Sequence, residues 1–163
     1  GGLFNSEGKL IGIVSAKEKD TSYENMGYAI PSNLAVAVAE NILRNCDGVA
    51  NEQVIRCYLG ITIAIKDAWT EYDTVTGVVN RKQTCSVNGI ENDSIAQSVL
   101  MVDDVIRSFE IDGVTYALNY YYSGSEILLY ADLGSTLFMN IERDGEAMRL
   151  RLPITESNFS KIK

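Results

Sequence analysis

Short apolar runs separated by polar breaks occupy residues 1–31. Residues 9–16, Lys-Leu-Ile-Gly-Ile-Val-Ser-Ala, are rich in β-branched side chains and predict a strand. A second strand is predicted over 26–30. It should end before Pro31, because proline has no N–H to donate to a sheet. The intervening residues, 17–25, are polar and predict a loop.

A helix is predicted directly after these strands, over residues 33–45. Ser32 is a candidate N-cap, and Leu34, Val38 and Ile42 recur at a four-residue step along one face. Two strands and one helix are too few elements to close a hydrophobic core. This segment therefore needs partners, which we expect upstream of the printed sequence.

From Glu52 onward the pattern changes to short strands with two short helices, which indicates a mixed α+β fold. The candidate strands are 54–65, 76–80, 84–90, 104–111, 136–142 and 147–153. Asp112-Gly113 and Asp144-Gly145 are tight-turn signals, and the second predicts a hairpin between the two strand-like runs around it.

The two helices of this region are predicted from their capping residues. Asp93 is a candidate N-cap for a helix over 94–99, and Ser125 for a helix over 126–132. The polar stretch 66–83 predicts a long loop.

Composition narrows the chemistry. The net charge is −8, which argues against nucleic acid as the main partner. The chain has no His, so a complete Ser-His-Asp or Cys-His mechanism cannot be assembled from it. The cysteines, Cys46, Cys57 and Cys85, show no C-x-x-C spacing, and the acidic residues lack the spacing of a calcium loop. We therefore expect no metal and no cofactor.

Three stretches of the first segment resemble the end of the trypsin-like protease domain of the HtrA (DegP-like) family. The stretches are Gly1-Gly2-Leu3-Phe4-Asn5, Gly8-Lys9-Leu10-Ile11-Gly12-Ile13 and Asn25-Met26-Gly27-Tyr28-Ala29-Ile30-Pro31. In that family a Gly-Asn-Ser carrying the nucleophile stands directly before the first stretch. One departure is that no Pro follows Gly2.

The resemblance implies that the catalytic serine would directly precede Gly1 and that no catalytic residue lies in this chain. The residues it implies as walls of the substrate cleft are Ile13, Val14, Ser15, Gly27, Tyr28 and Ala29.

The second segment resembles the PDZ domain that follows the protease in HtrA proteins. The matching stretches are Arg56-Cys57-Tyr58-Leu59-Gly60-Ile61, residues 92–106, Ile111-Asp112-Gly113 and residues 141–146. Val99 and Asp103 replace two family glycines, so the turns there must differ or carry strain.

A PDZ resemblance implies peptide binding by β-augmentation, in which a peptide adds a strand and a loop holds its terminal carboxylate. The implied peptide-binding residues are Arg56, Tyr58, Leu59, Gly60, Ile61 and Ile63, with Leu128 or Leu129 lining an apolar pocket. Arg56 is either a carboxylate ligand or a solvated surface charge. The run Tyr120-Tyr121-Tyr122 either rims the groove or belongs to an ordinary mixed stretch.

The expected organisation is a partial trypsin-like β-barrel segment (1–46), a linker (47–53), a PDZ domain (54–155), a small β-barrel or sandwich with two helices, and a C-terminal tail (156–163). The expected function is that of a fragment of an HtrA-like serine endopeptidase of protein quality control, itself inactive, that binds peptides or unfolded proteins with apolar C-termini. The alternative is a non-catalytic PDZ adaptor. The resemblance also implies a location outside the cytosol, in the periplasm or at the cell surface with a missing N-terminal anchor, and a homotrimer formed through the protease domain.

The absence of His yields a direct prediction. This chain is expected to show no serine-inhibitor-sensitive degradation of casein, because the general base of the triad is missing. Turnover of casein that a serine-protease inhibitor abolishes would refute the inactive reading.

Overall fold

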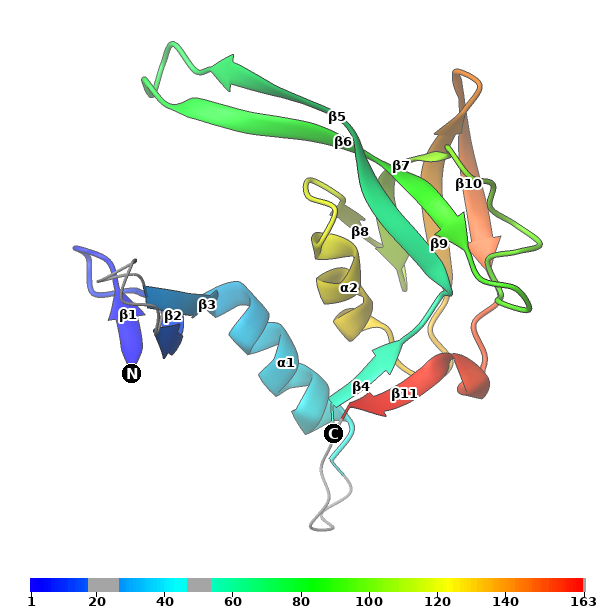
Figure 1. Cartoon of the computed structure of the whole chain (residues 1–163). Coiled ribbons are helices and arrows are strands. Elements are labelled where there is room, and N and C mark those ends of the chain that lie inside the picture. The colour runs from blue at the N-terminus through cyan, green and yellow to red at the C-terminus, as the bar shows by residue number, and fades with distance from the viewer. Residues whose placement is uncertain (18–26, 47–53, 163) are drawn as a thin grey trace. The chain divides into compact units, whose positions relative to one another are not determined.

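The computed structural model describes residues 1–17, 27–46 and 54–162 (Figure 1). The chain divides into two units, Gly1–Val54 and Ile55–Ile162. The mixed β and α+β composition expected from the sequence is confirmed. The expected linker 47–53 and nearly all of the expected loop 17–25 lie outside the described residues.

The first unit is a three-stranded antiparallel sheet followed by a helix. Its strands are β1 (Gly2–Phe4), β2 (Leu10–Lys17) and β3 (Gly27–Pro31), in the order β1-β2-β3. Helix α1 (Ser32–Arg44) begins directly after β3. Pro31 occupies the N-cap position and no side chain caps the helix, so the prediction of Ser32 as the N-cap was wrong.

The sheet of the first unit leaves much apolar surface exposed. Phe4, Ile11 and Val14 are among its exposed hydrophobic side chains. The buried side chains of α1 are Ala37 and Asn41. A core this small agrees with the expectation that these elements need partners.

The second unit is built around a six-stranded antiparallel sheet in the order β10-β9-β7-β6-β5, in which β8 pairs with β7. Its strands are β5 (Ile61–Tyr72), β6 (Val79–Ile90), β7 (Val105–Ile111), β8 (Val114–Ala117), β9 (Leu137–Arg143) and β10 (Glu146–Leu152). A separate pair joins β4 (Val54–Cys57) to β11 (Phe159–Ile162). The described strands form open sheets rather than a closed barrel.

Both tight-turn signals connect hairpins. Asp112 and Gly113 have φ of 49° and 83°, and Asp144 and Gly145 have φ of 52° and 83°. Positive φ at both central residues suits the twist of antiparallel strands. The predicted hairpin at Asp144-Gly145 is thereby confirmed as the turn between β9 and β10.

The region predicted as a loop, 66–83, is instead a long β-arm. Strands β5 and β6 pair from Ile61↔Ile90 to Tyr72↔Val79, so the separate strands predicted over 76–80 and 84–90 are one strand. The turn that joins them is held by Asp73, whose Oδ1 accepts the Val75 N–H at 2.8 Å. Because the arm pairs strand to strand, its exposed polar residues satisfy their backbone groups without a core.

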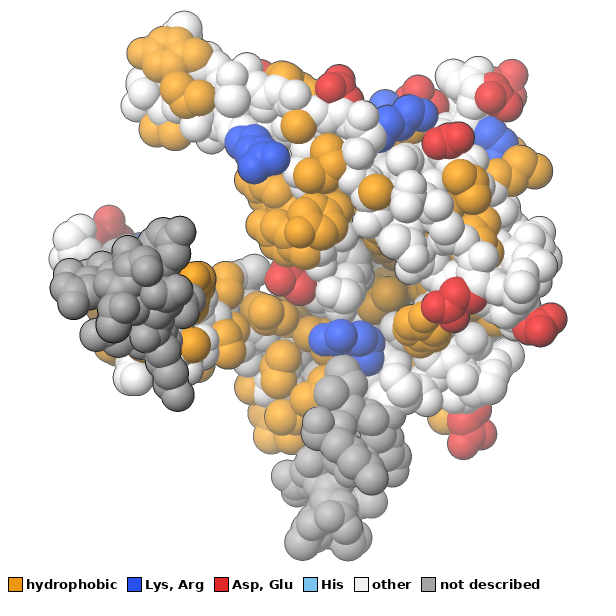
Figure 2. Space-filling model, in the orientation of Figure 1, with side chains coloured by type: hydrophobic (Ala, Val, Ile, Leu, Met, Phe, Trp, Pro, Cys, Tyr) orange, Lys and Arg blue, Asp and Glu red, His pale blue; other side chains and the backbone are white. Residues whose placement is uncertain are grey.

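The arm projects from the sheet (Figure 1). Strand β6 pairs with β7 only at Cys85↔Ile106 and Ser86↔Val105. The outer end of the arm carries the exposed hydrophobic side chains Tyr72, Val75, Val78 and Val79 (Figure 2).

The predicted helix over 94–99 is wrong, because this stretch forms a series of turns. Asp93 has φ of 61°, which does not suit an N-cap residue. The helix predicted over 126–132 is α2 (Ser123–Ile127), continued by the 3₁₀ turn η2 (Leu128–Tyr130). Ser125 lies inside α2, where its hydroxyl donates to the Tyr122 carbonyl at 3.0 Å, so it is not the cap.

The end of the chain and one glycine replacement add detail. Residues 156–162 of the expected tail form the 3₁₀ turn η3 (Glu156–Asn158) and β11. Asp103 has φ of 75°, a conformation that glycine adopts more easily, whereas Val99 does not have positive φ.

No helix among the described residues has both the length and the apolar character needed to cross a bilayer.

A buried ion pair joins the turn after residue 99 to the end of β9. Asp104 is 1% exposed, and Arg143 Nε and Nη2 donate to its two carboxylate oxygens at 2.7 Å each. Burial by itself raises the pKa of Asp104, but hydrogen bonds from Arg143 and the Met101 N–H, with the arginine charge, hold this pKa below its usual value. The carboxylate therefore stays ionised in the folded protein.

Replacing Arg143 by Met is expected to lower the free energy of unfolding by about 3–5 kcal/mol, because it leaves the buried Asp104 carboxylate unpaired. The matched control is Arg107→Met, which removes an exposed pair with Glu142 and should cost less than about 1 kcal/mol. Since the folded pKa of Asp104 is lowered, its stabilisation is complete above the unfolded pKa and is lost as pH falls through the folded pKa. Urea unfolding at neutral and acid pH measures both effects, and equal losses for the two variants would contradict the account.

Candidate functional site

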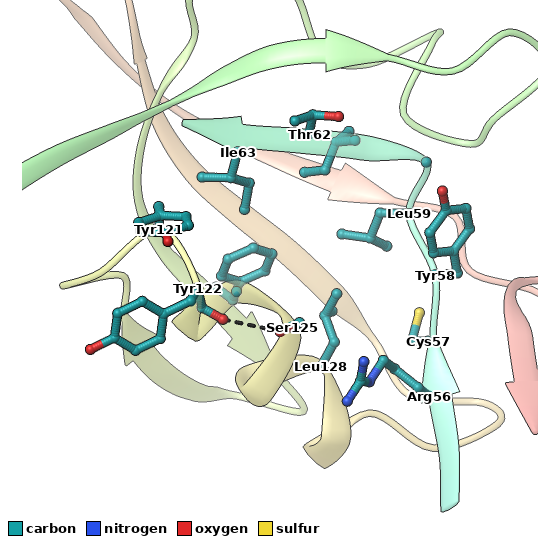
Figure 3. A pocket seen from close by; sticks show the side chains of 14 residues that line it. Arg56, Cys57, Tyr58, Leu59, Thr62, Ile63, Tyr121, Tyr122, Ser125 and Leu128 are labelled. Carbon is teal, nitrogen blue, oxygen red and sulfur yellow. Dashed lines mark hydrogen bonds between the residues drawn. The ribbon is translucent and has the colours of Figure 1, made fainter. Parts of the chain in front are cut away.

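A pocket of about 340 Å³ lies beside strand β5, between this strand and the segment that contains α2 (Figure 3). Its lining residues are Arg56, Cys57, Tyr58, Leu59, Gly60, Ile61, Thr62, Ile63, Phe109, Tyr121, Tyr122, Gly124, Ser125 and Leu128. We call this pocket the groove. Every wall of the groove belongs to the second unit.

One wall of the groove is an unused sheet edge. Strand β5 stands at the end of the strand order and pairs with β6 on its other side. An edge strand presents a row of backbone N–H and C=O groups that another extended chain can pair with. The groove therefore offers main-chain hydrogen bonding along one side.

The turn 58–60, which precedes β5, is held in place by residues distant in sequence. The Tyr58 N–H donates to the Asn158 carbonyl at 2.7 Å, and the Glu91 N–H donates to the Gly60 carbonyl at 2.8 Å. The Tyr58 hydroxyl also donates to the Glu91 carboxylate, and this hydrogen bond raises the pKa of Tyr58. The turn is thus fixed from two sides before any ligand arrives.

Gly60 is required by both backbone conformation and space. Its φ is 71°, a conformation that L side chains rarely adopt. A Cβ at this position would lie 2.3 Å from the Ser94 Cβ. Only glycine therefore allows the chain to turn from β4 into β5 here.

The interior of the groove is apolar. Leu59 and Leu128 are 2% and 8% exposed, and burial raises the pKa of the Cys57 thiol to about 12, so this side chain stays neutral. Gly124 allows α2 to approach β5, because a Cβ there would lie 2.7 Å from the Ile63 Cδ1. This lining suits an apolar side chain.

Arg56 is the cation that lines the groove. Figure 3 shows its guanidinium group below Leu128, at the same end of the groove as Cys57 and Tyr58. Its Nε is buried and has no hydrogen-bond partner among the described residues. A buried donor without an acceptor is costly. An anionic ligand at this end of the groove would satisfy it.

The structure brings most of the predicted peptide-binding residues together. Arg56, Tyr58, Leu59, Gly60, Ile61, Ile63 and Leu128 line the groove. Leu129, the alternative to Leu128, is fully buried and does not line it. Sequence reasoning missed Cys57, Thr62, Phe109, Gly124 and Ser125. The sequence left open whether Tyr121 and Tyr122 border the groove, and the structure places both on its lining.

The predicted cleft-wall residues lie on β2 and β3 of the first unit. Val14 pairs with Ala29, and the Ser15 hydroxyl donates to the Tyr28 carbonyl at 3.5 Å. Ile13, Val14 and Tyr28 are exposed. These residues therefore share one antiparallel pair and leave their side chains accessible. Across both units, the described residues include no group of three His, Cys, Asp or Glu side chains arranged to hold a metal ion.

Comparison with known proteins finds one curated sequence similar to this chain. The curated protein "Serine protease Do-like HtrA" of Bacillus subtilis (strain 168) is 28% identical over 168 residues, which cover 96% of this chain. The sequence is therefore similar to part of an HtrA serine protease. It spans only 34% of the length of that relative, consistent with the C-terminal part of an HtrA protein. No family model matches the sequence.

Solved HtrA structures support the fold. Two structures of the HtrA-type protease AlgW, one with a tripeptide and one with a decapeptide, are each 23% identical to this chain. Their TM-scores are 0.56 and 0.55, and the similarity covers 94% and 99% of this chain but 48% and 45% of theirs. The HtrA-like fold thus extends over both units.

Replacing Gly60 by Ala is expected to abolish any peptide binding in the groove, because the new Cβ meets Ser94 and the backbone there has positive φ. The control is Gly113→Ala, which has φ of 83° but nothing within 4 Å of its Cβ. The control should lose about 1 kcal/mol of stability and keep its binding. Peptide titration with urea unfolding separates the two effects, and wild-type binding by Gly60→Ala would contradict the role of the turn.

Proposed function

We propose that the second unit is a PDZ-type domain that binds the C-terminal end of an extended peptide in the groove. The observation that carries the proposal is that an edge strand, β5, begins at a turn with positive φ and borders an apolar pocket. Such an arrangement supports β-augmentation, in which the peptide pairs with the edge and one end of it is held by the turn.

The bound peptide runs antiparallel to β5, with its carboxylate at the turn 58–60. The N–H groups of Leu59, Gly60 and Ile61 point toward the carboxylate as an anion nest. The unpartnered Arg56 Nε adds a charged donor, which makes a stronger hydrogen bond than a neutral one. The last side chain of the peptide enters the apolar space beside Leu59 and Leu128. Peptides with apolar C-termini are therefore the favoured ligands.

We further propose that the whole protein is an HtrA-like serine endopeptidase that acts on damaged or unfolded proteins outside the cytosol, as a homotrimer formed through its protease domain. The similarity to a curated serine protease supports this proposal. We propose that β2 and β3 line the substrate cleft of the whole protein, and that its catalytic residues lie outside this chain. The present chain has no His and binds peptides without cleaving them.

The carboxylate mechanism is tested with one peptide in two forms, a free C-terminus and a C-terminal amide. The free acid should bind at least about tenfold more tightly, since charge-assisted hydrogen bonds contribute about 1.5–3 kcal/mol. Arg56→Gln should weaken binding of the acid and leave the amide unchanged. Isothermal titration with both forms measures the ratio. Equal affinity of the wild-type chain for acid and amide would rule out the carboxylate nest.

A further inference from the structure

A second cavity, of about 200 Å³, lies along strand β6 of the β-arm. Its lining residues are Asn80, Arg81, Lys82, Gln83, Asn119 and Tyr120. We call it the arm pocket. Unlike the groove it has a polar lining, and it combines residues of β6 with the segment just before α2. Neither the sequence motifs nor the proposed carboxylate mechanism uses it.

Stacked tyrosines connect the arm pocket to the groove. Tyr120 of the arm pocket stacks on Tyr122 of the groove, with ring centroids 5.4 Å apart and planes 7° apart. Tyr121 packs edge-on against Tyr122 at 5.5 Å. Figure 3 shows Tyr121 and Tyr122 at the end of the groove near Ile63, away from Arg56. The Tyr120–Tyr122 stack therefore brings one residue of each lining into contact.

The arm pocket is locally positive in an acidic molecule. The chain carries a net charge of −8, yet the ionisable groups of this lining other than Tyr120 are Arg81 and Lys82. Lys82 lies 4.0 Å from the Glu71 carboxylate. Among the described residues no salt bridge engages Arg81. Arg81 is therefore the cation left to meet an acidic ligand.

The register of the arm sets the length of ligand that can reach this pocket. Gln83 pairs with Ala68 and Asn80 with Glu71, so the arm pocket is level with residues 68–71 of β5. At a rise of ~3.3 Å per residue, Ala68 stands about 17 Å beyond Ile63. A tetrapeptide anchored at the turn 58–60 ends near Ile63, whereas a decapeptide spans the distance.

We propose that the arm pocket is a second compartment of the peptide groove, which accepts an acidic side chain upstream of the bound C-terminus. The inference rests on the proposed function, because the peptide must be anchored at the turn 58–60. It implies that the protein selects longer extended segments with an apolar end and an Asp or Glu upstream, rather than any apolar C-terminus.

The test uses decapeptides with an apolar free C-terminus in which Glu or Gln is placed at successive upstream positions. Glu should bind about two- to fivefold more tightly than Gln at one or two positions beyond the fourth residue from the C-terminus, the range expected for an exposed ion pair. The preference should fall at high salt. The corresponding tetrapeptides should bind equally well to wild type and Arg81→Gln.

Arg81 variants decide the assignment. Arg81→Gln should remove the preference for Glu, and Arg81→Glu should reverse it in favour of Lys at the same position. The control is Arg151→Gln, on β10 at the opposite end of the sheet, which should keep the wild-type preference. Because these side chains lie on a strand surface, circular dichroism should show an unchanged fold.

The outcomes separate the two proposals. Failure of free-acid tetrapeptides to bind overturns the proposed function and this inference with it. If the tetrapeptides bind normally, two results overturn the role of the arm pocket alone. One is that the decapeptides show no preference for Glu over Gln, and the other is that this preference persists in Arg81→Gln.

Discussion

The turn at Gly60 is the constraint on which the site depends. The single strand predicted over 54–65 is divided there into β4, which pairs with β11, and β5, which forms the edge of the six-stranded sheet. The backbone has positive φ, and Ser94 occupies the space where a side chain would stand. The same turn that separates the two sheets also lines one end of the groove. One residue thus links the topology of the unit to its chemistry.

Residues far away in sequence hold that turn in place. Glu91, at the end of β6, engages it through its N–H and its carboxylate, and Asn158, near the end of the chain, accepts the Tyr58 N–H. A turn prepared in this way loses less conformational freedom when a ligand binds. Farther from the groove, the buried Asp104–Arg143 pair joins another turn to β9. The groove is therefore a property of the whole second unit.

Much of the fold followed from local patterns. The candidate strands 104–111, 136–142 and 147–153 correspond to β7, β9 and β10. The Asp-Gly pairs indicated the turns that follow β7 and β9, because Asp-Gly readily adopts positive φ at two successive residues. The β-arm was missed because its polar side chains resemble those of a loop. Cross-strand pairing between Tyr72 and Val79, not burial, makes it a strand. A helix was predicted over 94–99 because Asp is a favoured N-cap residue, but Asp93 has positive φ and the stretch forms turns.

The sequence by itself determined the class of fold, the position of the turn with its glycine and the HtrA resemblance. These features depend on neighbouring residues, whose conformational preferences are readable in order along the chain. Only the tertiary structure decided that Leu128 rather than Leu129 faces the groove, that Tyr121 and Tyr122 also line it, and that Arg81 lines a second pocket. Side-chain direction on a short helix and proximity across strands depend on packing between distant elements, which no local pattern encodes.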